Sequence, residues 1–248
     1  MLARSPRRYS PTSRPSSRIR AMALLLEVIV QSVADARAAA RGGADRLEVV
    51  RAIRDGGLTP PVALVRGIAA EVSLPLRVIV RENAGYSTNG HELPALREAI
   101  ATFAAESVDG AVLGFADGGE LAIHDTVRVL DAAPAVKATF HRAFDQLRDP
   151  LDAIDRLAAI PQIDRILTSG GAGTSAERCE RLRTYTGRAH GRLIILAGSS
   201  VDEEMLALIG RTGCVAEVHV GRAARANGDP ESPVSAARVA RLRELAGA

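Results

Sequence analysis

Residues 137–146 read KATFHRAFDQ, and the change of character within this stretch decides how the fold is interpreted. Small and β-branched residues run up to His141, and Arg142 and Asp145 follow within four positions. A short apolar run that ends in charged residues is typical of a buried parallel strand whose end faces solvent. Seven further runs have the same apolar character: 24–30, 46–50, 76–81, 110–115, 165–169, 192–197 and 217–221.

Helical stretches separate these runs. Candidate helix starts combine a Ser, Thr or Asp cap with a following acidic residue or proline, at 32–35, 59–60, 149–150, 174–177 and 200–203. Candidate helix ends are the glycines at 42–43, 187 and 210. Eight strands alternating with helices predict an α/β protein with one (β/α)8 TIM-barrel domain over residues 23–248. A doubly wound open sheet is the alternative, but it usually needs fewer strands, and no GxGxxG follows the first run.

The first 22 residues form a basic extension. Residues 1–20 hold six arginines and no acidic residue, so the chain's net charge of +3 becomes −3 without them. Their Pro/Ser/Arg-rich composition predicts disorder, because such a segment cannot bury a core of its own. Translation from Met22, a transit peptide and a nucleic-acid tether are the alternatives for this segment. The mildly acidic remainder predicts no nucleic-acid partner for the folded domain.

Cysteine placement and hydropathy bear on the compartment. Cys179 and Cys214 lie outside any CxxC pair or histidine spacing, and we interpret them as two isolated thiols of a cytoplasmic protein. No apolar run reaches the roughly 18 residues that a membrane-spanning helix needs. We therefore expect no membrane partner.

Polar residues interrupt the apolar runs near their C-terminal ends, where TIM barrels carry their active sites. The candidates for catalytic and binding roles are Glu27, Glu48, Arg81, His141 and Asp145. Because a lone buried charge is costly, the gathering of these residues at one end predicts a shared, solvent-accessible cavity. Two alternatives stay open: Arg142 and Asp145 simply pair in a loop, and His219 is a hydrogen-bonded core histidine.

Glycine-rich turns after the last three runs predict an anion site. Glycine lets the backbone approach a ligand closely, and the following helix N-terminus offers N–H donors. The candidate anion-binding residues are Gly170, Gly171, Gly198, Ser199, Gly221 and Arg222. A small anionic or phosphorylated molecule is the ligand that such turns predict.

Several motifs resemble the CutC family, whose name refers to copper homeostasis. They are LEV (26–28), GGADRLE (42–48), GGLTP (56–60), TFHRAFD (139–145) and DRILTSGG (164–171). The resemblance extends from about residue 24 to 222. It implies a TIM barrel, a cytoplasmic location, a homodimer and a role in copper handling, and it implies no particular reaction.

The chain departs from the CutC pattern at the strand ends. Ile29 and Val50 stand where family members usually carry cysteines, and Cu(I) prefers soft thiolate and thioether ligands. Further departures lie at Gln31, 51–52, 82–83 and 197–200. Copper is thus implied by the resemblance but weakly supported by the residues, whereas a set of His141, His219, Glu27 and Glu48 offers ligands for a harder metal.

Two functions follow from these observations. The first is a CutC-like protein that binds copper or another metal ion without turnover. The second is an enzyme that acts on a small anionic or phosphorylated metabolite, with Glu27, Glu48 or His141 as general acid or base. Schiff-base chemistry is disfavoured, because the only lysine, Lys137, begins the run that His141 ends.

Overall fold

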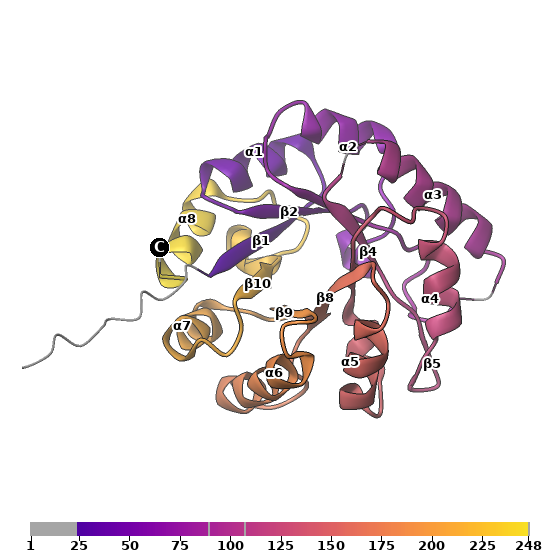
Figure 1. The fold of residues 1–248 in the computed structure, drawn as a ribbon. Coiled ribbons are helices and arrows are strands. Elements are labelled where there is room, and N and C mark those ends of the chain that lie inside the picture. Colours follow the sequence, from indigo (N-terminus) through magenta and orange to yellow (C-terminus); the bar gives the residue numbers. More distant parts are fainter. Residues whose placement is uncertain (1–23, 89, 107, 248) are drawn as a thin grey trace, which may run out of the picture.

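The structure is a computed structural model of the 248-residue chain, and it describes residues 24–88, 90–106 and 108–247. Parallel strands form a closed barrel in the order β1, β2, β3, β4, β7, β8, β9, β10 and back to β1 (Figure 1). The bounds are β1 Leu25–Val30, β2 Arg46–Val49, β3 Leu76–Ile79, β4 Gly110–Leu113, β7 Ala138–Phe140, β8 Ile163–Thr168, β9 Ile194–Ala197 and β10 Glu217–Val220. The predicted basic extension, residues 1–22, lies outside the described residues.

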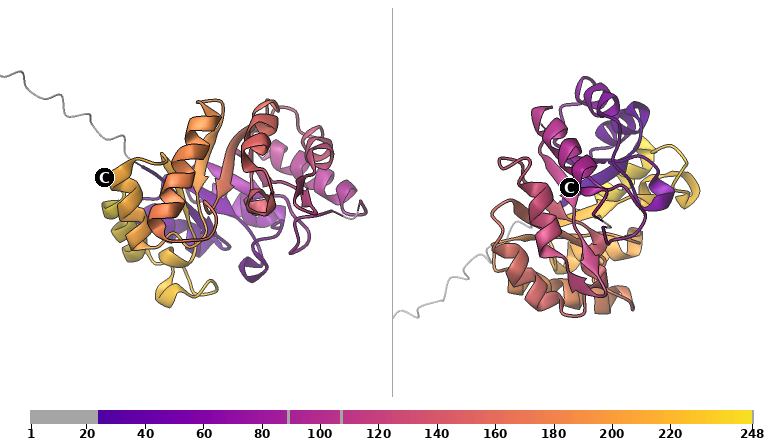
Figure 2. Two further views of the ribbon diagram at one scale, coloured as in Figure 1. Left: turned by 90° about the horizontal axis from the view of Figure 1, so that it is seen from below. Right: turned by 90° about the vertical axis from the view of Figure 1, so that its right-hand side faces the viewer.

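Helices surround this barrel, as two further views make clear (Figure 2). They are α1 Val33–Arg41, α2 Val62–Ala69, α3 Leu93–Ala105, α4 Ile123–Leu130, α5 Pro150–Ala158, α6 Ser175–Ala189, α7 Glu203–Thr212 and α8 Ala236–Leu245. The predicted TIM barrel is confirmed, and the open sheet is wrong because β1 pairs with β10 and closes the sheet. Among the described residues, no helix is long and apolar enough to cross a membrane.

Three of the predicted helix starts are capped as expected. The side chains of Ser32, Asp149 and Thr174 each accept a hydrogen bond from the backbone N–H three residues later. Thr174 also completes a capping box, because the Glu177 carboxylate accepts from the Thr174 backbone N–H. These caps satisfy N–H groups that have no partner within the helix.

Two starts and two ends were wrongly predicted. Helix α2 begins after Pro61 without a side-chain cap, and the cap of α7 is Asp202, not Ser200. Gly187 and Gly210 lie inside α6 and α7, which continue to left-handed residues. Tertiary packing of the two helices outweighs the modest cost of an interior glycine, so glycine alone did not mark their ends.

The barrel interior is layered because alternate strand residues point inward. Near the C-terminal ends of the strands, Ile29, Val50, Ile79 and Val112 form a small apolar cluster that is separate from the main core. The main core fills the space between the sheet and the helices. The layer below the small cluster is charged.

Ion pairs link arginines and carboxylates in this charged layer near the N-terminal ends of the strands. The pairs are Arg46–Glu27, Arg46–Glu217 (2.6 Å), Arg165–Glu217 (2.8 Å), Arg77–Asp164 (2.7 Å) and Arg77–Asp109 (2.9 Å). Arg46 and Arg77 are almost fully buried. Removing one partner of such a pair leaves a charge without compensation, which typically costs about 3–5 kcal/mol.

Cys179 and Cys214 form a disulfide, so the interpretation of two isolated thiols is wrong. Cys179 lies in α6 and Cys214 precedes β10, and their Cα atoms are 5.9 Å apart. The separation of 35 residues hid this proximity, because it arises only when α6 packs beside α7. The argument for a reducing compartment from unpaired thiols therefore falls away.

Candidate functional site

A cavity of about 550 Å³ opens at the C-terminal ends of the barrel strands. Its lining includes Glu48, Arg81, His141, Arg142, His219 and Arg222. Glu27 is not part of the lining and lies almost fully buried behind His219. The cavity volume falls within the range of roughly 300–1,000 Å³ that small-molecule sites occupy.

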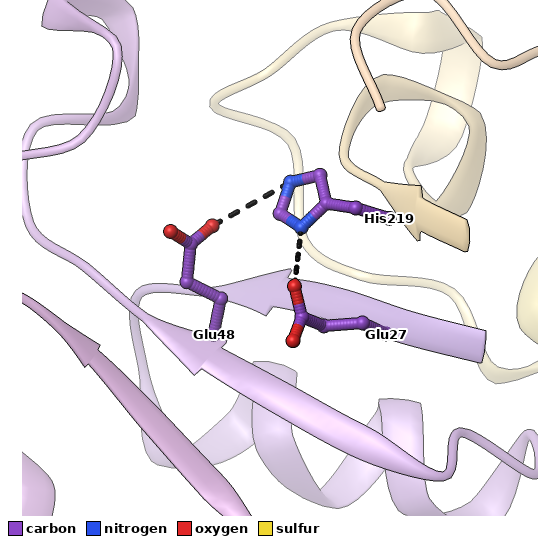
Figure 3. A group of neighbouring side chains, drawn as sticks. All are labelled: Glu27, Glu48 and His219. Atoms are coloured by element: carbon purple, nitrogen blue, oxygen red, sulfur yellow. Dashed lines mark hydrogen bonds and ion pairs between the residues drawn. The ribbon is translucent and has the colours of Figure 1, made fainter. Parts of the chain in front are cut away.

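Strand register brings Glu27, Glu48 and His219 together (Figure 3). Glu27 on β1 lies opposite His219 on β10, and Ile29, its neighbour along β1, lies opposite Glu48 on β2. Nδ1 of His219 is 2.8 Å from Oε1 of Glu27, and Nε2 is 3.5 Å from Oε2 of Glu48. One donor atom from each residue lies within 4.8 Å of the other two.

The Glu27 carboxylate is held in its ionised form. Burial alone would raise its pKa, but the Arg46 charge and the contact with His219 outweigh burial and lower the pKa to about 2. The Glu27 carboxylate therefore accepts a hydrogen bond from the Nδ1–H of His219. This contact fixes the imidazole so that Nε2 faces Glu48 and the cavity.

Glu48 has the opposite character. Burial raises the pKa of Glu48 to about 7, the Glu27 charge adds to this effect, and the charges of His219, Arg46 and Arg81 oppose it. Burial by itself lowers the pKa of His219, but the two carboxylates outweigh it and the pKa rises. Of the two carboxylates in the cluster, only Glu27 contacts Arg46, and this difference helps to separate their pKa values.

His141 lines the same cavity, but it is not one of the three residues of the cluster. Burial, with help from the charges of Arg81 and Arg142, lowers the pKa of His141 to about 3. Its Nδ1 accepts a hydrogen bond from the Ala143 backbone N–H at 3.2 Å. The neutral ring consequently carries its proton on Nε2, as a donor and not as a metal ligand.

Arg81 is a structural cation at the edge of the cavity. Its guanidinium donates to the carbonyl oxygens of Gly56, Gly57, Ala84 and Gly85, and it stacks 4.9 Å from the Tyr86 ring centroid. Burial lowers the pKa of Arg81 from its ordinary value. Arg81 holds the loops after β2 and β3 while it adds positive charge to the cavity.

Asp145 does not reach the cavity. Its carboxylate accepts from Thr168 Oγ1 at 2.6 Å and from the Ser169 N–H at 3.1 Å, and it pairs with Arg142 at 3.3 Å. The structure therefore shows the alternative interpretation, a loop pair that ties the end of β7 to the end of β8. This contact positions Arg142 at the cavity edge.

The predicted anion-binding residues are split. Ser199, Gly221 and Arg222 line the cavity, whereas Gly170, Gly171 and Gly198 do not. Arg178 occupies the turns after β8 and β9, where its guanidinium donates to the carbonyl oxygens of Ser169, Ser199 and Ser200. These turns are thus held together by a buried cation of the protein itself.

Sequence reasoning missed Arg46 and Arg178. Arg46 is the first residue of β2, two positions before Glu48, so the same alternation that placed Glu48 inside the barrel also places Arg46 there. Its partner on β1 could have been inferred from that pattern. Arg178 gives no such signal, because it contacts turns that follow two different strands.

Fold and site together define a TIM-barrel protein with a buried carboxylate–histidine cluster at the mouth of the barrel. The model of the CutC family matches residues 24–224. A family protein CutC from Agrobacterium fabrum is 33% identical over 216 residues, which cover 86% of this chain and 84% of the relative. The chain belongs to the CutC family.

More distant relatives agree with this assignment. A human "Copper homeostasis protein cutC homolog" is 28% identical over 79% of this chain and 72% of its own length. The crystal structure of a putative copper homeostasis protein CutC from Streptococcus agalactiae superposes with a TM-score of 0.73 at 23% identity, covering 79% of this chain and 97% of that chain. At this identity the structural likeness supports the fold alone.

Proposed function

We propose that this CutC family protein binds a divalent transition-metal ion at the mouth of the barrel, as part of metal and copper handling. The observation that carries the proposal is the three-residue donor cluster of Glu27, Glu48 and His219, whose ligand atoms lie within 4.8 Å of one another. Glu48 and Nε2 of His219 face the cavity and supply the ligands. Glu27 orients the imidazole through Nδ1, as carboxylates commonly do for metal-bound histidines.

The donor set suits Cu²⁺ or Zn²⁺ and does not suit Cu⁺. Imidazole and carboxylate ligands bind divalent first-row metals, among which Cu²⁺ is usually bound most tightly. Cu⁺ needs soft sulfur ligands, but Ile29 and Val50 present hydrocarbon at the barrel mouth. The two cysteines are buried in a disulfide and line no part of the cavity.

Calorimetric titration of purified protein with Cu²⁺ and Zn²⁺ tests the proposal. We expect one site per chain, and we expect Glu48→Gln and His219→Gln each to weaken binding at least tenfold, in the range of about 10–100-fold typical for changes around a metal. Glu203→Gln, which removes an exposed carboxylate outside the cluster, is the matched control. Equal affinity of all four proteins would contradict the proposal.

Copper in its reduced form provides a second, independent readout. Under anaerobic conditions, competition with a Cu⁺ chelator should show no tight stoichiometric site, because no thiol or thioether of residues 24–88, 90–106 and 108–247 lines the cavity. One tight Cu⁺ site per chain that survives alanine substitution of both cysteines would show that the ligand argument is wrong.

Acid–base catalysis on an anionic metabolite has less support. Of the three candidate groups, Arg46 keeps Glu27 ionised, and the neutral His141 ring offers no free acceptor to the cavity. Glu48, whose pKa is about 7, is the one candidate that suits a general acid or base. A cytoplasmic homodimer is part of our proposal through the family resemblance. Light scattering on the full chain at micromolar concentration tests the dimer, and fractionation of cells tests the location.

A further inference from the structure

His141 presents an unused donor to the cavity. The residue is only 4% exposed, yet it belongs to the cavity lining. Its Nδ1 is occupied by the Ala143 N–H, which leaves the proton on Nε2. Within residues 24–88, 90–106 and 108–247, this Nε2 has no hydrogen-bond partner. This donor opens onto the cavity, where a ligand oxygen can accept from it and take the place of solvent.

Positive charge surrounds this donor. Arg81 and Arg142 both lie close enough to His141 to lower its pKa through their charges. Arg142 uses Nε for Asp145, and in the described part of the chain neither of its Nη atoms has a partner. Arg81 has no carboxylate partner in the same residues, because carbonyl oxygens hold it. An anion placed here would compensate Arg81 and would share Arg142 with Asp145.

We propose that the cavity binds a small organic oxyanion whose carboxylate or phosphate group accepts hydrogen bonds from His141 Nε2–H and the Arg142 guanidinium. The body of the molecule then rests on the apolar wall formed by Ile29, Ile79 and Leu167. This site lies at the ends of β3 and β7, not in the glycine turns after β8 and β9. It does not depend on the cation proposed above, since it shares no residue with the donor cluster.

Calorimetry on protein treated with EDTA tests this site without any metal. Glycerol 3-phosphate probes the phosphate form of the ligand, and malate probes the carboxylate form. We expect saturable binding of at least one probe with one site per chain. Arg142→Ala should weaken it about tenfold or more, because it removes a charge-assisted hydrogen bond to the anion. Arg148→Ala, an exposed arginine outside the cavity lining, is the matched control and should change nothing.

His141→Asn separates the donor from the local fold. Asparagine can still accept from the Ala143 N–H through Oδ1, but its side chain ends short of the Nε2 position. We expect it to weaken binding about as much as Arg142→Ala does. If His141→Asn fails to fold, Arg142→Ala decides alone, since that side chain is 45% exposed.

Three outcomes would overturn the inference. Neither probe binds saturably, or both variants bind as wild type does, or Arg222→Ala abolishes binding while Arg142→Ala leaves it intact. The last result would move the anion to the turn after β10. The anion titrations contain no metal, so their results do not depend on whether the cation titration succeeds. Each of the two proposals can therefore be contradicted without the other.

Discussion

Two glutamates in one cluster carry opposite acid–base character because their neighbours differ. Glu27 forms an ion pair with Arg46 and a 2.8 Å contact with His219, whereas Glu48 has His219 alone as an ion-pair partner among the described residues, at 3.5 Å. The pKa of Glu27 is therefore held at about 2, whereas burial raises the pKa of Glu48 to about 7. Near neutral pH, Glu48 is the carboxyl group of this cluster that exchanges a proton.

Glu48→Gln should stabilise the protein at alkaline pH. The Glu48 pKa rises from 4.5 to about 7 on folding, so the folded protein binds this proton more tightly than the unfolded chain. The stability from this proton is fully present below pH 4.5 and is lost as the pH rises through 7. Glutamine loses nothing over that range, so its advantage at pH 8 should be on the order of 3 kcal/mol.

Thermal unfolding of wild type and Glu48→Gln between pH 4.5 and 8 measures this effect. The difference in melting temperature should grow with pH, whereas Glu203→Gln should follow wild type throughout. A constant difference across the series would show that Glu48 ionises normally in the folded state.

The sequence predicted much of this site at the level of single residues. Inward alternation and position near a strand end correctly placed Glu48, Arg81 and His141 at the cavity, whereas Glu27, which was expected there too, is buried behind His219. The donor geometry was not predictable, because it depends on how β1 registers against β10, and these strands lie at opposite ends of the chain. Asp145 was misplaced for the same reason, since its partners Thr168 and Ser169 follow another strand.

At the scale of elements, strands were easier to predict than their connections. All eight barrel strands were predicted from apolar runs, but the hairpin of β5 (Ala116–Asp117) and β6 (Glu120–Leu121) was missed. Two-residue strands are too short to show alternation. The signal that could have found them is the Gly118–Gly119 turn, where both residues have positive φ, as hairpin turns require.

Loss of the Cys179–Cys214 disulfide should destabilise the packing of α6 against the end of the barrel. The bond closes a loop across 35 residues, and loop-closure entropy predicts a loss of about 3–4 kcal/mol when it is absent. We expect denaturant unfolding of the double alanine variant to show this loss relative to oxidised wild type.

A reducing agent serves as the internal control for this experiment. It should bring wild type toward the stability of the double variant and leave the double variant unchanged. If thiol labelling of unfolded, unreduced wild type finds two free cysteines, the disulfide does not form in the purified protein.

At the scale of the whole molecule, the proposed cation lies where the barrel closes. Its ligands come from β2 and β10, on either side of β1, the strand that joins the first and last parts of the chain. A bound cation would therefore link β2 to β10 and stabilise the closed barrel. The folded state gains from such binding because the unfolded chain offers no preformed site.

Metal removal should lower the melting temperature. At a free metal concentration of 100 times Kd, binding adds about 2.7 kcal/mol to the free energy of unfolding. For a domain of this size that corresponds to about 5–10 °C. Scanning calorimetry with Zn²⁺ and then with EDTA measures the shift, and His219→Gln, which binds at least tenfold more weakly, should show about half of it or less. An equal shift in that variant would place the metal elsewhere.

The position of Lys137 has a practical consequence for measuring all of these affinities. It is the only lysine of the chain, it is exposed, and it immediately precedes β7, whereas the cavity opens beyond the other end of the same strand. Besides the α-amino group of the chain, amine-reactive dyes and sensor surfaces will therefore find one side chain, and it lies at the end of the barrel away from the cavity. Protein attached through Lys137 should present its cavity outward in a single orientation, without any engineered tag.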